Sequence, residues 1–256
     1  MDRVVIVSGG GTGIGRAAAR RFAEDGDRVL LVGRREAVLR QTAEELTAEG
    51  AVRGGIGTLA ADLTGPEGAQ RVRDEAGARY GRVDVLVGSA GGNVKYASGG
   101  KEPPGGLAGV AWQWRSDFES NVLTAVLLAE ALTDLLQAPG RRVVLLSSIA
   151  AYRGSGTGSY AASKAALHPY VYELAGRLGP HGATVNAVAP GFVEATGFFG
   201  GRMPQERREA LAAQTVTGRT GTPEDVAETV FWLASPGAAQ VTGQIVQING
   251  GARYGN

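Results

Sequence analysis

The sequence predicts an α/β protein with a doubly wound, mostly parallel sheet of about seven strands and helices on both faces. Short runs rich in Val, Ile and Leu alternate with longer amphipathic segments along the chain. These runs are apolar at nearly every position, which is typical of parallel strands covered on both faces. A length of 256 residues without a linker-like change in composition predicts one domain over 1–256.

In chain order, each expected strand is an apolar run and each expected helix is the amphipathic segment that follows it. Strands and helices are expected alternately over 3–7, 14–25, 28–32, 36–49, 58–61, 66–80, 83–87, 117–136, 142–146, a helix carrying Tyr160, 184–188, 223–233 and 244–248. Residues 92–116 form a long Gly- and Pro-rich loop with Tyr96, Trp112 and Trp114, which we expect to face a substrate or an oligomer partner. Pro169 should kink the helix of Tyr160, because proline lacks an N–H and clashes with the preceding turn.

Composition argues against several classes of function. The formal charge is +1, with 26 basic and 25 acidic residues scattered along the chain, so we expect neither nucleic-acid nor membrane binding. There is no cysteine, and His168 and His181 lack a metal-ligand spacing, so we expect no metal site. The sequence shows no signal peptide and no apolar run long enough to span a membrane, which predicts a cytoplasmic protein.

A glycine-rich turn joins the first expected strand to the first expected helix. Glycines let the backbone approach a pyrophosphate closely, and the N–H groups at the start of the helix face the anion. At the first strand–helix junction of an alternating chain, such a turn predicts dinucleotide binding; the alternative is a tight turn with no ligand. The expected phosphate-binding residues are Gly9, Gly11, Thr12, Gly13, Ile14 and Gly15.

The end of the second strand bears on the choice of cofactor. An acid there would bind the adenosine ribose of NAD, whereas arginine suits the 2′-phosphate of NADP. The sequence has Arg34 and Arg35 and lacks the acid, which predicts NADP(H). Alternatively, both arginines are solvated residues at the start of a helix, where Glu36 could pair with one of them.

Tyr160 and Lys164 are four residues apart on an expected helix, so their side chains lie on the same face. A nearby ammonium group favours the phenolate and would bring the pKa of the tyrosine closer to neutral. Arginine is the usual cation of this chain, which has only three lysines, so the lysine here suggests that a compact ammonium is needed. A surface Tyr/Lys pair is the alternative.

Over essentially its whole length the chain resembles the classical short-chain dehydrogenases/reductases, and among them the 3-oxoacyl-(acyl-carrier-protein) reductases. That family has a Rossmann fold, and its motifs occur here in the family's order. Besides the glycine turn and the Tyr160/Lys164 pair, they are Asp62-Leu63, Ser89-Ala90-Gly91, Asn121, Ser147-Ser148, Asn186-Ala187-Val188-Ala189-Pro190-Gly191, Gly243-Gln244 and Asn249-Gly250-Gly251.

The resemblance implies a role for each of these positions in cofactor binding. Asp62 would bind the adenine, with the backbone of Leu63 beside it, although Asp62 could be only a turn residue. Further along the chain, other positions would contact the ribose and the nicotinamide. They are Ser89, Ala90 and Gly91 for the ribose and Pro190, Gly191, Val193 and Thr196 for the nicotinamide.

The resemblance also implies a catalytic set. Ser148 would hold the substrate carbonyl, with Ser147 as the competing candidate, while Tyr160 donates a proton as hydride arrives. Lys164 would contact the nicotinamide ribose and lower the pKa of Tyr160. Asn121 would hold a water that links Lys164 to solvent, or it could be a buried asparagine bonded to backbone.

Some positions differ from the family pattern. Ser89-Ala90-Gly91 stands where two asparagines are common in the family. Ala195 stands where we expect threonine, so a contact of the cofactor's carboxamide with Thr196 would be shifted.

The segment after Gly191 corresponds to the family's substrate lid and carries four apolar side chains. They are Phe192, Phe198, Phe199 and Met203.

These features predict an NADP-dependent oxidoreductase that reduces a ketone to a secondary alcohol, or catalyses the reverse. The apolar side chains of the lid favour a small-molecule substrate such as a 3-oxoacyl thioester, free or carrier-linked, or an aromatic ketone; alternatively, they pack the lid against the body of the protein. A steroid, sugar or polyol alcohol is an alternative substrate, and a non-catalytic NADP-binding protein is an alternative function. The apolar helices around 122–136 and 161–174 predict a homotetramer, because such helices form the family's tetramer interface.

Overall fold

Seven strands form a single parallel sheet in the computed structural model, which describes residues 2–94, 104–154, 157–196 and 204–255. The strand order is β3-β2-β1-β4-β5-β6-β7, so the direction of winding reverses between β1 and β4. The strands are β1 Val4–Ser8, β2 Arg28–Gly33, β3 Ile56–Ala60, β4 Val85–Gly88, β5 Arg142–Leu146, β6 Thr184–Pro190 and β7 Ile245–Ile248. The predicted doubly wound fold is confirmed.

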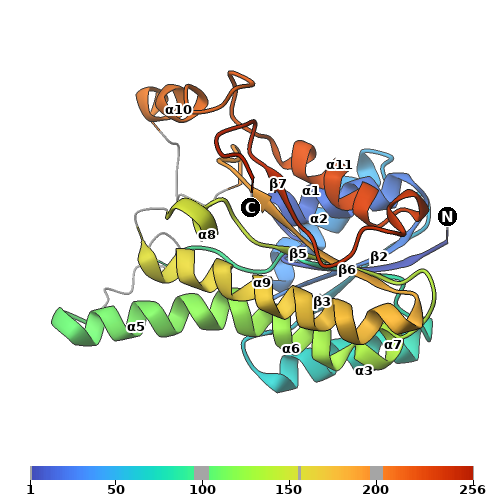
Figure 1. Ribbon diagram of the computed structural model, residues 1–256. Coiled ribbons are helices and arrows are strands. Elements are labelled where there is room, and N and C mark those ends of the chain that lie inside the picture. The colour runs from blue at the N-terminus through green and yellow to red at the C-terminus, as the bar shows by residue number, and fades with distance from the viewer. Residues whose placement is uncertain (1, 95–103, 155–156, 197–203, 256) are drawn as a thin grey trace.

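Helices cover both faces of the sheet (Figure 1). One face packs against α1 Gly13–Glu24, α2 Glu36–Ala48 and α11 Pro223–Leu233. The other packs against α3 Pro66–Tyr80, α6 Thr124–Ala131 and α9 Gly158–Leu178. Because both faces are covered, β1, β4, β5 and β6 are buried at every position, as their continuous apolar runs predicted.

The region between β4 and β5 differs from the sequence-based prediction. Part of the expected loop 92–116 is helical, because α5 spans Gly106–Phe118 and packs beside α9 (Figure 1). The expected helix 117–136 is divided into the end of α5, a π-helical turn Glu119–Leu123, α6 and α7 Thr133–Leu136. Trp112 and Trp114 therefore lie on a helix, whereas Tyr96 lies outside the described residues.

Further short helical segments among the described residues were not expected from the sequence. They are α8 Ala150–Arg153, α10 Gln205–Ala212 and the 3₁₀ turns Gly179–His181 and Pro236–Ala238. Helix α9 continues across Pro169 to Leu178. Phe198, Phe199 and Met203 of the predicted lid fall outside the described residues.

Candidate active site

The glycine turn follows β1 and ends in the first residues of α1. A Cβ built on Gly15 would lie 2.3 Å from the carbonyl oxygen of Gly9, so only glycine lets the helix pack this closely against the turn. Thr12 is the N-cap residue of α1, but its hydroxyl does not cap the helix, and acidic residues are absent from the first turn. This helix start therefore has the geometry and electrostatics that suit an anion.

The loop after β4 lies against the glycine turn. The backbone N–H of Ala90 donates to the Ser8 hydroxyl at 3.1 Å, and a Cβ on Gly9 would lie 2.9 Å from the carbonyl oxygen of Ser89. The two turns flank the point between β1 and β4 where the winding of the sheet reverses. Nucleotides bind at this position in doubly wound sheets.

The Pro-Gly loop after β6 reaches the same turn from the other side. A Cβ on Gly13 would lie 3.3 Å from Cα of Thr196, so the two loops are in close contact. Pro190 ends β6, Gly191 donates to Ile248 at 2.9 Å, and Val193 forms a β-bridge with Gly221. The sequence-predicted phosphate, ribose and nicotinamide positions are thus brought together at one edge of the sheet.

Within this Pro-Gly loop, Ala195 has a φ of 55°. Alanine rarely adopts this left-handed conformation, so the backbone here is strained. The Thr196 hydroxyl turns back to donate to the carbonyl of Val193 at 3.4 Å. Ala195, which stands where we expect the family's threonine, therefore also has an unusual backbone conformation.

The predicted adenosine-binding residues lie at the ends of β2 and β3. Arg34 and Arg35 are exposed and directly follow β2. Asp62 is exposed and accepts two hydrogen bonds from Thr64, at 3.0 Å from the backbone N–H and 2.8 Å from the hydroxyl. These bonds, and more weakly the charge of Arg34, lower the pKa of Asp62, whereas its neighbour Leu63 is buried. Asp62 therefore forms a turn with Thr64, and both hydrogen bonds from Thr64 end on its Oδ1 atom.

Ser148 and Tyr160 come together although they lie on different elements. Ser148 follows β5 and accepts a hydrogen bond from the N–H of Ala150 at 3.1 Å, which fixes its side chain at the start of α8. Tyr160 is in the first turn of α9 and is 7% exposed. The two side chains are hydrogen-bonded to each other. A polar group entering this site would meet two hydroxyls at one point.

The structure separates Ser147 from this pair. The Ser147 hydroxyl is buried, bonds His168 Nε2 at 2.8 Å and donates to the carbonyl of Lys164 at 3.2 Å. It is thus part of the packing between β5 and α9. Of the two candidate serines, Ser148 is the one placed beside Tyr160.

Lys164 lies one turn after Tyr160 and is also buried. Its Nζ donates to the carbonyl of Leu146 at 2.7 Å, where β5 ends. Burial lowers the pKa of Lys164 to about 8, and the carboxylate of Asp117 opposes that change. The ammonium group is thus held at the edge of the sheet from which the nucleotide-binding loops project.

The charge state of Tyr160 differs from the sequence-based expectation. We expected Lys164 to lower the pKa of Tyr160, but burial raises it to about 12, with a contribution in the same direction from Asp117. The bond with Ser148 lowers it and offsets part of this rise. The Lys164 ammonium is instead directed to the carbonyl of Leu146. With a pKa of about 12, Tyr160 is a protonated phenol at neutral pH.

Asn121 occupies the π-helical turn and has no exposed surface. Its Nδ2 donates at 2.9 Å to the carbonyls of Gly92 and Asp117, and its Oδ1 accepts from the N–H of Gly92 at 2.9 Å. A Cβ on Gly91 would lie 2.5 Å from Oδ1 of Asn121 and 3.2 Å from Nζ of Lys164, so Gly91 leaves room between them. The amide is bonded to backbone, as in the alternative interpretation, while Oδ1 keeps capacity for a second donor such as water.

Sequence reasoning missed one buried residue of the site, Asp117, which we placed only at the start of a helix. It contacts the catalytic helix through Ser159, and it affects the pKa of both Tyr160 and Lys164. Its spacing of four residues from Asn121, which places both on one helical face, could have identified it.

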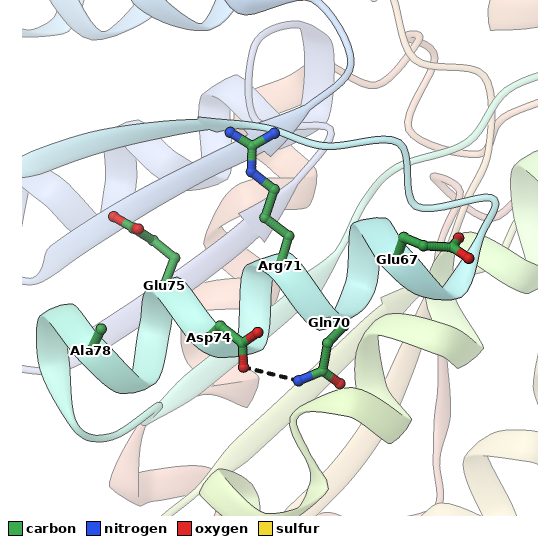
Figure 2. Close-up of a pocket in the computed structure, with 6 residues that line it drawn as sticks. All are labelled: Glu67, Gln70, Arg71, Asp74, Glu75 and Ala78. Atoms are coloured by element: carbon green, nitrogen blue, oxygen red, sulfur yellow. Dashed lines mark hydrogen bonds between the residues drawn. The ribbon is translucent and has the colours of Figure 1, made fainter.

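Over the described residues, no cluster of three or more potential metal ligands occurs and no helix is long and apolar enough to cross a membrane. A shallow hollow of about 560 Å³ lies along the outer face of α3 (Figure 2), far in sequence from the site. It is lined by the side chains of one helix, among them Gln70 and Asp74, which bond each other at 2.9 Å.

Comparisons with known proteins identify the family. A family model described as enoyl-(acyl carrier protein) reductase matches residues 9–253. The chain is 34% identical to the short-chain reductase protein NovJ of Streptomyces niveus, over 98% of this chain and 94% of that protein. It is 31% identical to the 3-oxoacyl-(acyl-carrier-protein) reductase FabG of Vibrio cholerae, over 97% and 96%. The chain belongs to the classical short-chain dehydrogenase/reductase family.

The structural comparison agrees with this assignment. A crystal structure described as a short-chain dehydrogenase/reductase, glucose/ribitol dehydrogenase, from Brucella melitensis matches with a TM-score of 0.85 and 29% identity, covering 99% of this chain and 97% of that one. As a short-chain dehydrogenase/reductase, the protein is an oxidoreductase for CH–OH and C=O groups that works with a nicotinamide cofactor. The close-approach glycine turn described above fits such a dinucleotide.

Proposed function

We propose that this short-chain dehydrogenase/reductase uses NADPH to reduce a ketone to a secondary alcohol, or catalyses the reverse. One observation carries the proposal: the hydroxyls of Ser148 and Tyr160 are bonded to each other beside the nucleotide-binding loops. Two hydroxyl donors at one point suit a carbonyl oxygen that gains negative charge during reduction. We further propose that residues 1–256 act as a single domain in the cytoplasm.

The residues of this site divide the work of reduction between them. When bound, a reduced nicotinamide would supply the hydride. Ser148 orients the carbonyl by donating to its oxygen, and Tyr160 gives the phenolic proton to the same oxygen as the alcohol forms. Lys164 holds positive charge at the end of β5, one helical turn after Tyr160, and the remaining acceptor position of Asn121 Oδ1 can hold a water for proton return. A pKa of about 12 keeps Tyr160 in the proton-donating form at neutral pH.

We propose NADP(H) as the cofactor because Arg34 and Arg35 directly follow β2. Both side chains are exposed, and neighbouring Asp62 is engaged with Thr64. Guanidinium groups bind a 2′-phosphate through charge-assisted hydrogen bonds, whereas an acid at this place would repel it.

For the substrate, we propose a 3-oxoacyl thioester, free or linked to a carrier, or a related apolar or aromatic ketone. Relatives include FabG reductases of 3-oxoacyl-(acyl-carrier-protein) and a hydroxy(phenyl)methylsuccinyl-CoA dehydrogenase subunit from Thauera aromatica, 29% identical to this chain. Phe192, which directly follows Gly191 in the Pro-Gly loop, supplies an apolar side chain in the segment after β6.

We also propose a homotetramer, supported by one apolar surface. Helix α5 carries large apolar side chains at a helical spacing, and each is at least 36% exposed. We call this surface the α5 stripe; it consists of Leu107, Val110, Trp114 and Phe118. Helix α5 lies beside α9 (Figure 1), and Tyr172 of α9 is also exposed.

Turnover with a panel of substrates tests the proposed function. The panel would contain a 3-oxoacyl thioester, an enoyl thioester, an aromatic ketone, a steroid ketone and a sugar ketone, each with NADPH and with NADH. We expect ketone-dependent oxidation of NADPH, fastest with the thioester or the aromatic ketone. Tight NADPH binding without turnover of any compound would instead favour a non-catalytic NADP-binding protein, and turnover of the enoyl thioester alone would contradict carbonyl reduction.

The cofactor proposal has its own test. Replacing Arg34 and Arg35 with alanine should raise the KM for NADPH by about 10-fold or more, since charge-assisted bonds to phosphate are lost, and should leave the KM for NADH almost unchanged. Arg40→Ala is the matched control, because Arg40 is an exposed arginine on α2 whose partner is Glu36 at 3.6 Å. Equal use of NADH by the wild-type enzyme would overturn the proposal.

A further inference from the structure

Asp117 is a fully buried carboxylate between the catalytic helix and the loop that follows β4. The Ser159 hydroxyl donates to its Oδ2 at 2.7 Å, and the backbone N–H of Val94 donates to its Oδ1 at 3.1 Å. The two oxygens of one side chain therefore join segments that lie 65 positions apart in the sequence numbering. A parallel bond from Asn93 Nδ2 to the Thr157 hydroxyl, at 2.8 Å, joins the same two segments.

The contacts of Asp117 reach the immediate neighbours of the catalytic residues. Ser159 directly precedes Tyr160 in the first turn of α9. The backbone carbonyl of Asp117 accepts from Nδ2 of Asn121 at 2.9 Å, so Asp117 also orients that amide. Its position thus affects where both Tyr160 and Asn121 lie, although it does not itself bond to Tyr160 in any described contact.

The charge of Asp117 also affects the pKa of the catalytic residues Tyr160 and Lys164. A buried carboxylate is costly unless hydrogen bonds and positive charge compensate it. Tyr160 and Lys164, both on α9, are the described titratable groups whose pKa responds to Asp117, and it raises the pKa of each. His168, further along α9, bonds Ser147, and burial alone lowers its pKa. Glu119 and Arg115 on the neighbouring turns are exposed.

We propose that Asp117 is a positioning residue for the proposed reaction: its buried carboxylate, bonded to Ser159 and to Val94, fixes the start of α9 beside Tyr160 and places a negative charge in the site that holds the Lys164 ammonium. The inference rests on the proposed function, because it assigns Asp117 a role in the same site. Without the carboxylate, burial would favour neutral Lys164, and the positive charge at the end of β5 would be lost at a lower pH.

The test measures the titration of Lys164 directly. The sequence has three lysines, Lys95, Lys101 and Lys164, so ¹³C-labelled lysine gives three Cε resonances, and Lys164→Met assigns one of them. In the wild-type protein, the Lys164 resonance should titrate with a midpoint near the pKa of about 8. In Asp117→Asn, which keeps the size of the side chain and removes the charge, we expect the midpoint to fall by about 1 pH unit, a typical effect of losing a nearby opposite charge.

Ser159→Ala is the matched control, since it removes the bond to Oδ2 but keeps the carboxylate. We expect this variant to leave the Lys164 midpoint unchanged and to lower kcat several-fold, whereas Asp117→Asn lowers kcat by about 10-fold or more and moves the alkaline limb of kcat/KM to lower pH. Asp117→Ser removes the same charge and serves if Asp117→Asn does not fold.

A Lys164 midpoint in both Asp117 variants equal to that of the wild type would overturn the inference. Equal displacement in Ser159→Ala would also overturn it, because the effect would then follow from altered packing. The NMR titration does not need turnover, so an inactive wild-type protein would count against the proposed function and leave this test in place. An active wild-type enzyme with unshifted Asp117 variants would count against the role of Asp117 alone.

Discussion

Burial sets the charge states of the two residues that carry the proposed proton transfer. Tyr160 and Lys164 are 7% and 5% exposed, and both shift toward their neutral forms. The neutral form of tyrosine is its protonated form, and burial raises the pKa of Tyr160 to about 12. The neutral form of lysine is its deprotonated form, and burial lowers the pKa of Lys164 to about 8. Near pH 7 the site therefore holds a phenol together with an ammonium group, which suits reduction of a carbonyl.

This combination predicts the pH dependence of reduction. Tyr160 remains protonated up to a pKa of about 12, while Lys164 loses its proton as the pH rises through about 8. Because the reaction needs both protonated forms, kcat/KM for NADPH should be highest below pH 8 and should fall above it. Measured cofactor binding over the same range would separate a loss of affinity from a loss of chemistry. A constant kcat/KM up to pH 10 would show that the charge of Lys164 is not needed.

Ser148 gives a second prediction at the scale of single residues. Ser148→Ala removes the hydroxyl that bonds Tyr160 and would orient the carbonyl, so we expect kcat to fall by about 10²-fold or more, as when one donor to a developing oxyanion is removed. Ser147→Ala is the control, because that hydroxyl bonds His168 and a backbone carbonyl. A greater loss of activity in Ser147→Ala than in Ser148→Ala would reverse the assignment of the two serines.

Among the secondary-structure elements, those with a strong local signal were predictable from the sequence. The apolar runs gave the seven strands, and Gly9 and Gly15 marked the turn at which the first helix begins. Helix α5 was missed because Gly106 and Gly109 lower helix propensity, and its packing beside α9 compensates. The division of the next segment was missed because a π-helical turn at Asn121 has no distinctive periodicity.

The start of α11 offers a test of local stability. The Thr222 hydroxyl accepts from the N–H of Asp225 at 3.2 Å, and the Asp225 carboxylate accepts from the N–H of Thr222 at 2.8 Å, which forms a capping box. Thr222→Ala should lower the free energy of unfolding by about 1 kcal/mol in urea denaturation. Thr229→Ala, within the same helix, should change it little, since alanine is the better helix former. A Thr222→Ala variant as stable as the wild type would show that packing alone fixes α11.

For the whole molecule, the sheet topology explains why distant residues form one site. The strands β1, β4, β5 and β6 are adjacent and parallel, so the segments that follow them all emerge at the same edge. The order of motifs in the sequence was sufficient to place these segments, but not to find which atoms meet. The bond of Ser148 to Tyr160 and the burial of Asp117 depend on contacts across α5, α8 and α9, which periodicity does not encode.

The proposed assembly gives a prediction at this scale. Light scattering should show a mass near four times the chain mass of 26.3 kDa. Val110→Glu places a charge in the α5 stripe, where Val110 is 53% exposed, and should shift the protein to smaller species because burying a charge is costly. Ala78→Glu adds the same charge on the exposed face of α3 (Figure 2) and should leave the mass unchanged. A monomeric wild-type protein would contradict the proposed tetramer.

The central claim is that Tyr160 donates the proton in an NADPH-dependent reduction. Its most direct test is the rate of ketone-dependent NADPH oxidation by Tyr160→Phe, compared with the wild type on the best substrate of the panel, together with NADPH affinity. The phenyl ring keeps the packing of the buried site and removes only the hydroxyl. We expect turnover to fall by about 10³-fold or more while NADPH binding is nearly unchanged. Turnover equal to that of the wild type would contradict the account.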